Sequence, residues 1–132
     1  MAKVRVSLYL TGDSVPFEYL TEQLGVLPFL TRKKQDWPHP SVLAGVAVDT
    51  WEYRTTKENA LSISAQLDKV EQIFGGKVET IQTLLERYSL KCNIVILVEA
   101  ECSNFPEMVL SEENISFLAA IKAELGFDLY IE

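Results

Sequence analysis

The run from Cys92 to Cys102 constrains the fold more than any other part of the chain. It is the most apolar run in the sequence, and residues 94–98 at its centre are rich in β-branched side chains. Such a composition is typical of a central strand. Its even-numbered positions are small or apolar throughout, whereas its odd-numbered positions are apolar in the middle and acidic at Glu99 and Glu101. We therefore expect one face of this strand to lie in the core, and the other to be partly covered and then open to water.

The length and charge of the chain limit its class. Its 132 residues suit a single domain spanning residues 1–132 with one apolar core. A formal charge of −7 argues against nucleic acid and against anionic membranes as partners. No apolar run approaches the roughly 20 residues that cross a bilayer, and the first residues lack the apolar stretch of a signal peptide. The sequence therefore predicts a cytoplasmic protein.

The two cysteines are predicted to be buried free thiols. In one extended strand, at ~3.3 Å per residue, Cys92 and Cys102 lie ~33 Å apart. A disulfide needs Cα atoms within roughly 7 Å of each other, so these two residues do not bridge. Both belong to the even-numbered, core-facing positions of the strand.

The first half of the chain predicts a strand, a helix and a second strand. Residues 3–11 alternate polar and apolar, which is typical of a half-covered strand. A helix is expected over 15–25, with Ser14 as its cap. Residues 26–44 hold three prolines within thirteen positions and are expected to form a long loop. Residues 45–53 predict an edge strand, and their pattern does not decide which side chains face inward.

The second half predicts three helices around the central strand. Apolar stripes indicate helices over 60–74 and 78–88, joined at Gly75-Gly76 into an antiparallel helical hairpin. Ser111 is expected to cap a helix over 111–125. A closing strand follows, with Phe127, Leu129 and Ile131 expected inward.

This order of elements predicts an α+β fold. Each outer half is a strand–helix–strand unit, as in a ferredoxin-like split βαβ sandwich, and the helical hairpin is inserted between the halves. The sheet of such a fold is mainly antiparallel, and its first and third long strands lie side by side. That position suits the apolar run at 92–102.

Several segments carry a resemblance to a known family. They are Val6-Ser-Leu-Tyr-Leu-Thr-Gly12, Pro16-Phe-Glu-Tyr-Leu-Thr-Glu-Gln-Leu-Gly25, Leu27-Pro28, Trp51-Glu-Tyr-Arg-Thr55, Leu110-Ser-Glu-Glu113 and Phe127-Asp-Leu-Tyr130. Through them, nearly the whole chain resembles an uncharacterised bacterial family, domain of unknown function 4279. It departs from the family at 31–44, where members usually carry a glycine. The resemblance supports the fold and implies no established activity, cofactor or catalytic residue.

No motif in the sequence specifies a chemistry. His39 is the only histidine and has no partner at metal-ligand spacing, so we expect no metal site and no cofactor. Glu99 and Glu101 share a strand face, where a carboxylate pair ~6–7 Å apart would suit acid–base chemistry. Acidic side chains at the wet end of a sheet face are the commoner explanation.

The most informative surface is the sheet face opposite the helices at 15–25 and 111–125. The alternative is that the 60–88 hairpin covers part of it. If the face is open, its aromatic and acidic side chains suit a partner, and the basic loop beside it suits an anion. The candidate binding residues are Tyr9, Asp49, Trp51, Tyr53, Glu99 and Tyr130 on the sheet, with Arg32, Lys33, Lys34 and Trp37 on the loop.

Three functions remain open at this point. The first is a non-enzymatic binding domain that caps a cationic protein partner, such as an immunity-type protein that neutralises a toxin. The second is a small-molecule sensor with a pocket between the sheet and the helical hairpin. The third is a hydrolase-type enzyme that uses Glu99 or Asp49, and the sequence favours a binding function over it.

Overall fold

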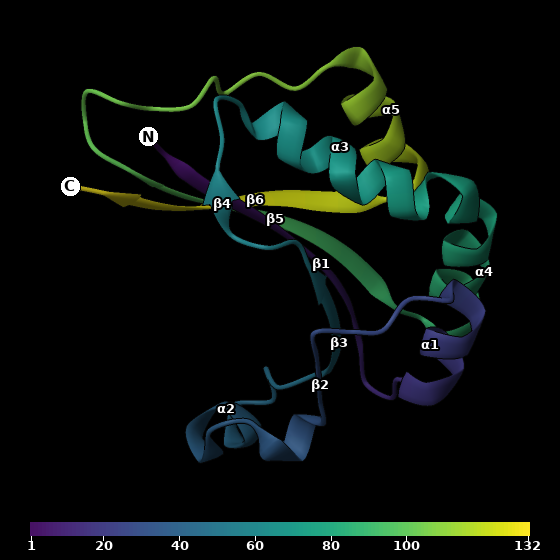
Figure 1. Cartoon of the computed structure of the whole chain (residues 1–132). Coiled ribbons are helices and arrows are strands. Elements are labelled where there is room, and N and C mark those ends of the chain that lie inside the picture. The colour runs from purple at the N-terminus through teal and green to yellow at the C-terminus, as the bar shows by residue number, and fades with distance from the viewer.

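The fold is a six-stranded sheet with most of its helices on one side (Figure 1). The computed structural model describes residues 1–132. The strands are β1 (Lys3–Gly12), β2 (Leu30–Arg32), β3 (Asp49–Arg54), β4 (Glu58–Asn59), β5 (Lys91–Ala100) and β6 (Ala123–Ile131). The α-helices are α1 (Phe17–Leu24), α2 (His39–Leu43), α3 (Ile63–Phe74), α4 (Val78–Tyr88) and α5 (Glu112–Ala120), with short 3-10 helices η1 (Lys34–Asp36) and η2 (Gly75–Lys77).

The strand order is β2-β3-β1-β5-β6, and the short β4 pairs with β1. All pairings are antiparallel except that of β5 with β6. The α+β class and the mainly antiparallel sheet are therefore confirmed. The neighbouring positions of β1 and β5, the first and third long strands, are confirmed as well.

The ferredoxin-like arrangement is not confirmed. In a split βαβ unit another strand lies between the two strands of the unit. Here β1 and β3, which precede and follow α1 in the sequence, are direct neighbours in the sheet. The same holds for β5 and β6, which precede and follow α5. Moreover, β1 and β3 run antiparallel, whereas the two strands of a βαβ unit run parallel.

The core lies between the sheet and helices α1, α3, α4 and α5. The prediction of a central strand is confirmed for 92–100, because the even-numbered positions of β5 from Cys92 to Val98 are buried and β5 is an interior strand. The apolar side chains of β1 lie on the same side, opposite them in register. We call this side the helix face and the other side the open face. Helix-face residues include Val4, Val6, Leu8, Leu10, Ile94 and Ile96, and helix residues packed on them include Leu20, Leu67, Val70, Phe74 and Ile81.

Helices α3 and α4 both pack on the helix face, but they do not form an antiparallel hairpin. Gly75 has right-handed helical angles (φ −59°, ψ −33°), so the chain continues through η2 as a bent helical path rather than reversing. Figure 1 shows α3 lying along the sheet and α4 turning away at its end. The 60–88 segment therefore leaves the open face uncovered.

The ends of the helices follow local chemistry. Gly25 ends α1 with a left-handed conformation (φ 65°), which glycine adopts without strain. Ser14 does not cap α1, because the helix begins after Pro16 and has no side-chain cap. Ser111 caps α5 as predicted: its hydroxyl accepts from the Asn114 N–H, and the Asn114 side chain accepts from the Ser111 N–H.

The fully buried Asn114 is also the centre of a partly buried polar cluster between α5 and α3. Its amide donates to Asp68 Oδ1 at 2.9 Å and to Glu71 Oε1 at 2.6 Å. Its side-chain oxygen accepts from the Ser64 hydroxyl at 2.6 Å. This cluster fixes α5 on α3 through hydrogen bonds rather than apolar contacts alone.

The predicted end of the last helix was wrong. Helix α5 stops at Ala120, and Lys122 turns the chain with a positive φ of 54°. Leu125 and Gly126 consequently lie in β6, which starts at Ala123. The β6 residues Phe127, Leu129 and Ile131 do point to the helix face but stay about half exposed, because α5 covers only the start of this edge strand (Figure 1).

Two expectations for residues 26–53 were also wrong. Residues 26–44 are not a plain loop: they contain β2, η1 and α2. The prolines are compatible with α2 because Pro38 occupies its N-cap position and Pro40 lies in its first turn, where the missing N–H needs no partner. In turn, β3 is not an edge strand, because β2 pairs along its outer side.

The cysteines differ from each other. Cys92 is buried and Cys102 is exposed in the turn after β5; both are free thiols. The prediction of a buried Cys102 was wrong because β5 ends at Ala100. None of the helices combines the length and the apolar content needed to cross a bilayer.

Candidate functional site: the open face of the sheet

The open face carries a hollow that we call the open-face groove. Its volume is about 450 Å³, and its floor is formed by β1, β2, β3 and β5. The segment from η1 to the start of β3 forms its wall; Figure 1 shows this segment on the far side of the sheet from the four longer helices. The lining residues are Tyr9, Thr11, Leu30, Arg32, Trp37, Val48, Thr50, Glu52, Arg54, Asn93 and Val95.

An ion pair with a buried carboxylate lies in the floor of this groove. Arg54 Nε donates to Glu52 Oε2 at 2.7 Å, and the Glu52 side chain is only 3% exposed. The guanidinium carbon of Arg54 also lies 3.7 Å from the centre of the Phe29 ring. The guanidinium is thus held in one orientation by a carboxylate and by an aromatic ring.

Arg32 and Trp37 lie together at the side of the groove. The guanidinium carbon of Arg32 is 5.5 Å from the centre of the Trp37 ring, within cation–π distance. The Trp37 indole N–H is buried and has no hydrogen-bond partner. A buried donor without an acceptor is energetically unfavourable.

Tyr9 contributes a neutral phenol to the floor. Burial raises the pKa of Tyr9, and the carboxylate of Glu52 raises it further, which outweighs the lowering by Ser7, Arg54 and Arg5. The phenol therefore stays protonated at neutral pH and offers both a donor and an acceptor.

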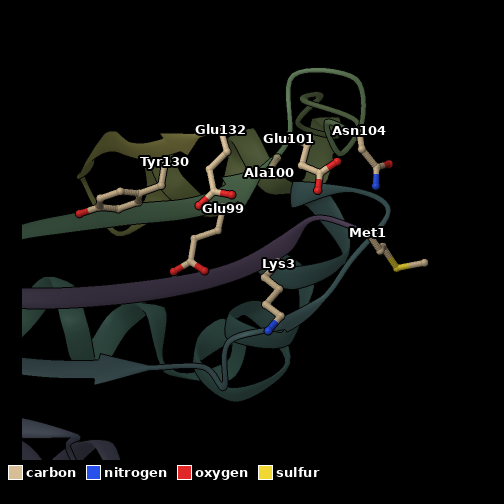
Figure 2. A pocket seen from close by; sticks show the side chains of 8 residues that line it. All are labelled: Met1, Lys3, Glu99, Ala100, Glu101, Asn104, Tyr130 and Glu132. Atoms are coloured by element: carbon tan, nitrogen blue, oxygen red, sulfur yellow. The ribbon is translucent and has the colours of Figure 1, made fainter.

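A second hollow, which we call the acidic cleft, lies at the other end of the open face. Figure 2 shows Glu99 and Glu101 from β5 and the turn after it, Tyr130 and Glu132 from the β6 end, and Lys3 on β1. Its volume is also about 450 Å³. Lys57 Nζ donates to Glu99 Oε1 at 2.7 Å, and this hydrogen bond lowers the pKa of Glu99. No group of three or more His, Cys, Asp or Glu side chains is arranged to hold a metal ion.

Asp49 has a structural position rather than an open one. Its carboxylate accepts from the Val15 N–H at 3.0 Å and from the Lys34 N–H at 2.8 Å. It thereby ties the loop before α1 and the start of η1 to β3. The Lys34 side chain pairs with Asp13 at 2.6 Å, and Lys33 lies beside this pair.

The structure therefore divides the ten predicted residues into four groups. Tyr9, Arg32 and Trp37 meet in the open-face groove. Asp49, Lys33 and Lys34 form the neighbouring cluster, and Glu99 and Tyr130 belong to the acidic cleft.

Trp51 and Tyr53 do not lie on the open face, where they were predicted, but on the helix face. Trp51 is fully buried, and its indole N–H donates to Thr21 Oγ1 of α1 at 3.1 Å. Tyr53 packs edge-on against Phe74 of α3. The alternation of β3 places both large aromatics in the core and turns Glu52 and Arg54 to the open face.

Glu52, Arg54 and Asn93 are the main groove residues that sequence reasoning missed. One signal could have found the first two: in Trp51-Glu-Tyr-Arg54 the aromatic and charged residues alternate. Assigning the aromatics to the core places the charges opposite them. Asn93 also had a signal, because it occupies an odd-numbered position of the predicted central strand and is aligned with Tyr9 on β1.

The fold and its hollows define a class: a small α+β domain with helices on one sheet face and a grooved, uncovered second face. A family model described as Domain of unknown function (DUF4279) matches residues 2–132. The chain belongs to this family. Comparison with curated proteins and with solved structures returned no match.

Proposed function

We propose that this protein is a cytoplasmic, non-enzymatic binding domain that holds a small molecule in the open-face groove. The observation that carries the proposal is the Glu52–Arg54 pair in the groove floor, whose carboxylate is buried and whose guanidinium is partly exposed. Replacing a buried ion pair with apolar side chains is often neutral or stabilising, so such a pair is weak evidence for a role in stability. A recognition role explains its position in the floor of a hollow.

The size and lining of the groove support the same proposal. A volume of about 450 Å³ is within the range of small-molecule sites. Five apolar or aromatic side chains, among them Val95 and Leu30, line it together with six polar or charged ones that can orient a ligand. The site lies on the other side of the sheet from the pocket that the sensor hypothesis expected, since the space between the sheet and α3 is filled by the core.

A second candidate function is that of an immunity-type protein that binds a cationic protein partner. It is favoured by the acidic cleft, where Glu99, Glu101 and Glu132 accompany the exposed Tyr130 in a chain of charge −7. Charge complementarity of this kind speeds association and selects partners. A pull-down that recovers a stoichiometric basic protein, lost on Glu101→Lys, supports this candidate.

The enzyme hypothesis gains no support from the geometry. A general acid or base at neutral pH needs a shifted pKa close to the working pH. The pKa of Glu99 is lowered by Lys57 instead. Both carboxylate oxygens of Asp49 are occupied by backbone N–H groups.

Native mass spectrometry of protein purified without denaturation from its own source tests the proposal. We expect a stoichiometric small-molecule adduct on the wild-type chain. Val95→Trp fills the groove and should remove the adduct. Ile115→Trp, on the exposed side of α5, is the matched control and should keep it. An adduct that persists in Val95→Trp, or no adduct at all, contradicts the proposal.

A further inference from the structure

The net charge of the open-face groove is opposite in sign to that of the whole chain. The groove holds two guanidiniums, Arg32 and Arg54, against one carboxylate, Glu52, whereas the chain carries a charge of −7. Glu52 already accepts from Arg54 and is almost fully buried. The remaining charge that a ligand meets is therefore positive.

Arg32 is the guanidinium available to a ligand. It forms none of the ion pairs found within the chain, which join Lys34 to Asp13, Arg54 to Glu52, Lys57 to Glu99 and Lys69 to Glu58. Its side chain is exposed, and its only aromatic contact is the Trp37 ring. A planar fork of donors without a carboxylate partner is suited to a carboxylate or a phosphate.

The neighbouring groups select a flat ligand rich in acceptors. Trp37 offers an aromatic surface at the side of the groove. The side-chain amide of Asn93 and the neutral phenol of Tyr9 add further donors. Apolar contact comes from Leu30, Val48 and Val95.

The floor is rigid enough to hold such a ligand in one orientation. Arg54 is fixed between the Glu52 carboxylate and the Phe29 ring, and Glu52 lies on the interior strand β3. A preorganised floor lowers the entropy cost of binding.

Resting on the proposed binding function, we infer that the ligand of the open-face groove is a small planar anion. It consists of an aromatic ring system with one carboxylate or phosphate group. The anionic group binds the guanidinium of Arg32, and the ring lies against Trp37 over the floor formed by Glu52 and Arg54.

A set of naphthalene probes separates charge from shape. The four probes are 2-naphthoate, 2-naphthyl phosphate, the neutral 2-naphthalenemethanol and the cationic 2-naphthylmethylammonium. They share one ring system and differ in the charged group. We expect either anion to bind at least about tenfold more tightly than the alcohol and the ammonium, because charge-assisted hydrogen bonds are the strong ones. Comparing the affinities of the two anions then shows whether the groove favours a carboxylate or a phosphate.

Binding is followed through the indole N–H signals of a ¹⁵N-labelled chain. The protein has two tryptophans, so it gives two such signals, and Trp37→Phe assigns them. The Trp37 signal should move saturably with the anionic probes. The Trp51 signal should stay, because its N–H is buried on the helix face and bound to Thr21.

Arg32→Gln should remove the preference for the anions. Arg87→Gln is the matched control: Arg87 is also exposed, and its guanidinium carbon lies 5.8 Å from the Tyr88 ring, but on α4. It should leave all four affinities unchanged.

Three results would overturn the inference: equal binding of the neutral or cationic probe, an equal loss in Arg32→Gln and Arg87→Gln, or no Trp37 response to any probe at millimolar concentration. If native mass spectrometry still finds an adduct that Val95→Trp removes, the binding function stands and only the planar anion is wrong.

Discussion

The Nε atom of Arg54 lies 2.7 Å from Oε2 of Glu52, two positions earlier on the same face of β3. The pair is buried on the carboxylate side, where the Glu52 side chain is shielded from water. An ion pair in this position makes each partner depend on the other. Removing the cation leaves a buried charge, whereas removing both charges leaves none.

The first prediction concerns this dependence. Arg54→Met should lower the free energy of unfolding by about 2–4 kcal/mol, because the Glu52 carboxylate loses its partner. The double variant with Glu52→Gln should recover part of this loss, since it also removes the buried charge. Urea denaturation of the two single variants and the double variant measures the coupling. Additive losses would show that the two side chains act independently.

The second prediction compares the two tryptophans. Trp51→Ala should cost about 3–5 kcal/mol, because it empties a fully buried position and removes the hydrogen bond to Thr21. Trp37→Ala should cost less than about 1 kcal/mol, because Trp37 is only partly buried and its N–H has no partner to lose. Thermal and urea unfolding provide the comparison, and similar losses in both variants would contradict the assignment of faces on β3.

The third prediction tests the polar cluster at Asn114. Asn114→Ala should destabilise the protein by about 2–4 kcal/mol, because it removes the side-chain oxygen that accepts from the Ser111 N–H and leaves Asp68 and Glu71 without their donor. Asn104→Ala, in the exposed turn after β5, is the control and should change stability by less than about 0.5 kcal/mol. Hydrogen exchange should show the loss first in α5.

The fourth prediction concerns the two cysteines. Burial raises the pKa of Cys92 from near 9 to about 12, so this thiol stays protonated and shielded at neutral pH. Iodoacetamide should modify the exposed Cys102 alone in the folded protein, and both thiols in urea. Mass spectrometry counts the carbamidomethyl groups attached to the protein, and the Cys102→Ser variant should carry none under native conditions.

The same shift gives a pH dependence. Because the folded pKa of Cys92 lies above the unfolded one, its contribution to stability is fully present below pH 9 and is lost between pH 9 and about 12. The loss amounts to at most roughly 4 kcal/mol over this range. Cys92→Ala should therefore flatten the decline in unfolding free energy at alkaline pH, and an unchanged decline would exclude Cys92 as its source.

The fifth prediction addresses the acidic cleft. Lys57→Met should raise the pKa of Glu99 toward its usual range, because the hydrogen bond from Lys57 is the largest cause that lowers it. Carboxyl ¹³C shifts recorded against pH measure the change. Lys69→Met removes the partner of Glu58 instead and should leave Glu99 unchanged.

The elements that the sequence predicted well have strong local or periodic signals. The strand at 92–102 is apolar on every even position, and Ser111 carries the hydroxyl that caps α5. These signals depend on neighbours along the chain, so they can be interpreted without knowledge of the tertiary fold.

The features that were missed depend on contacts between distant segments. The inward face of β3 is decided by Thr21 and Phe74, which approach Trp51 and Tyr53 from α1 and α3. The open-face groove exists because Trp37 and Val48, from the segment after β2, line the same hollow as residues of β1 and β5. Of the predicted site residues, Tyr9, Arg32 and Trp37 meet there, since odd positions of β1 and the basic loop happen to share this face.

The register of the two central strands also has a consequence for folding. Lys3 is aligned with Glu99, so β1 acquires its second long neighbour only after nearly a hundred residues have left the ribosome. Until then one edge of β1 has no permanent partner, and closing so long a segment is entropically costly. Folding of this domain should therefore be a slow, late and collective event rather than a stepwise growth from the first strand.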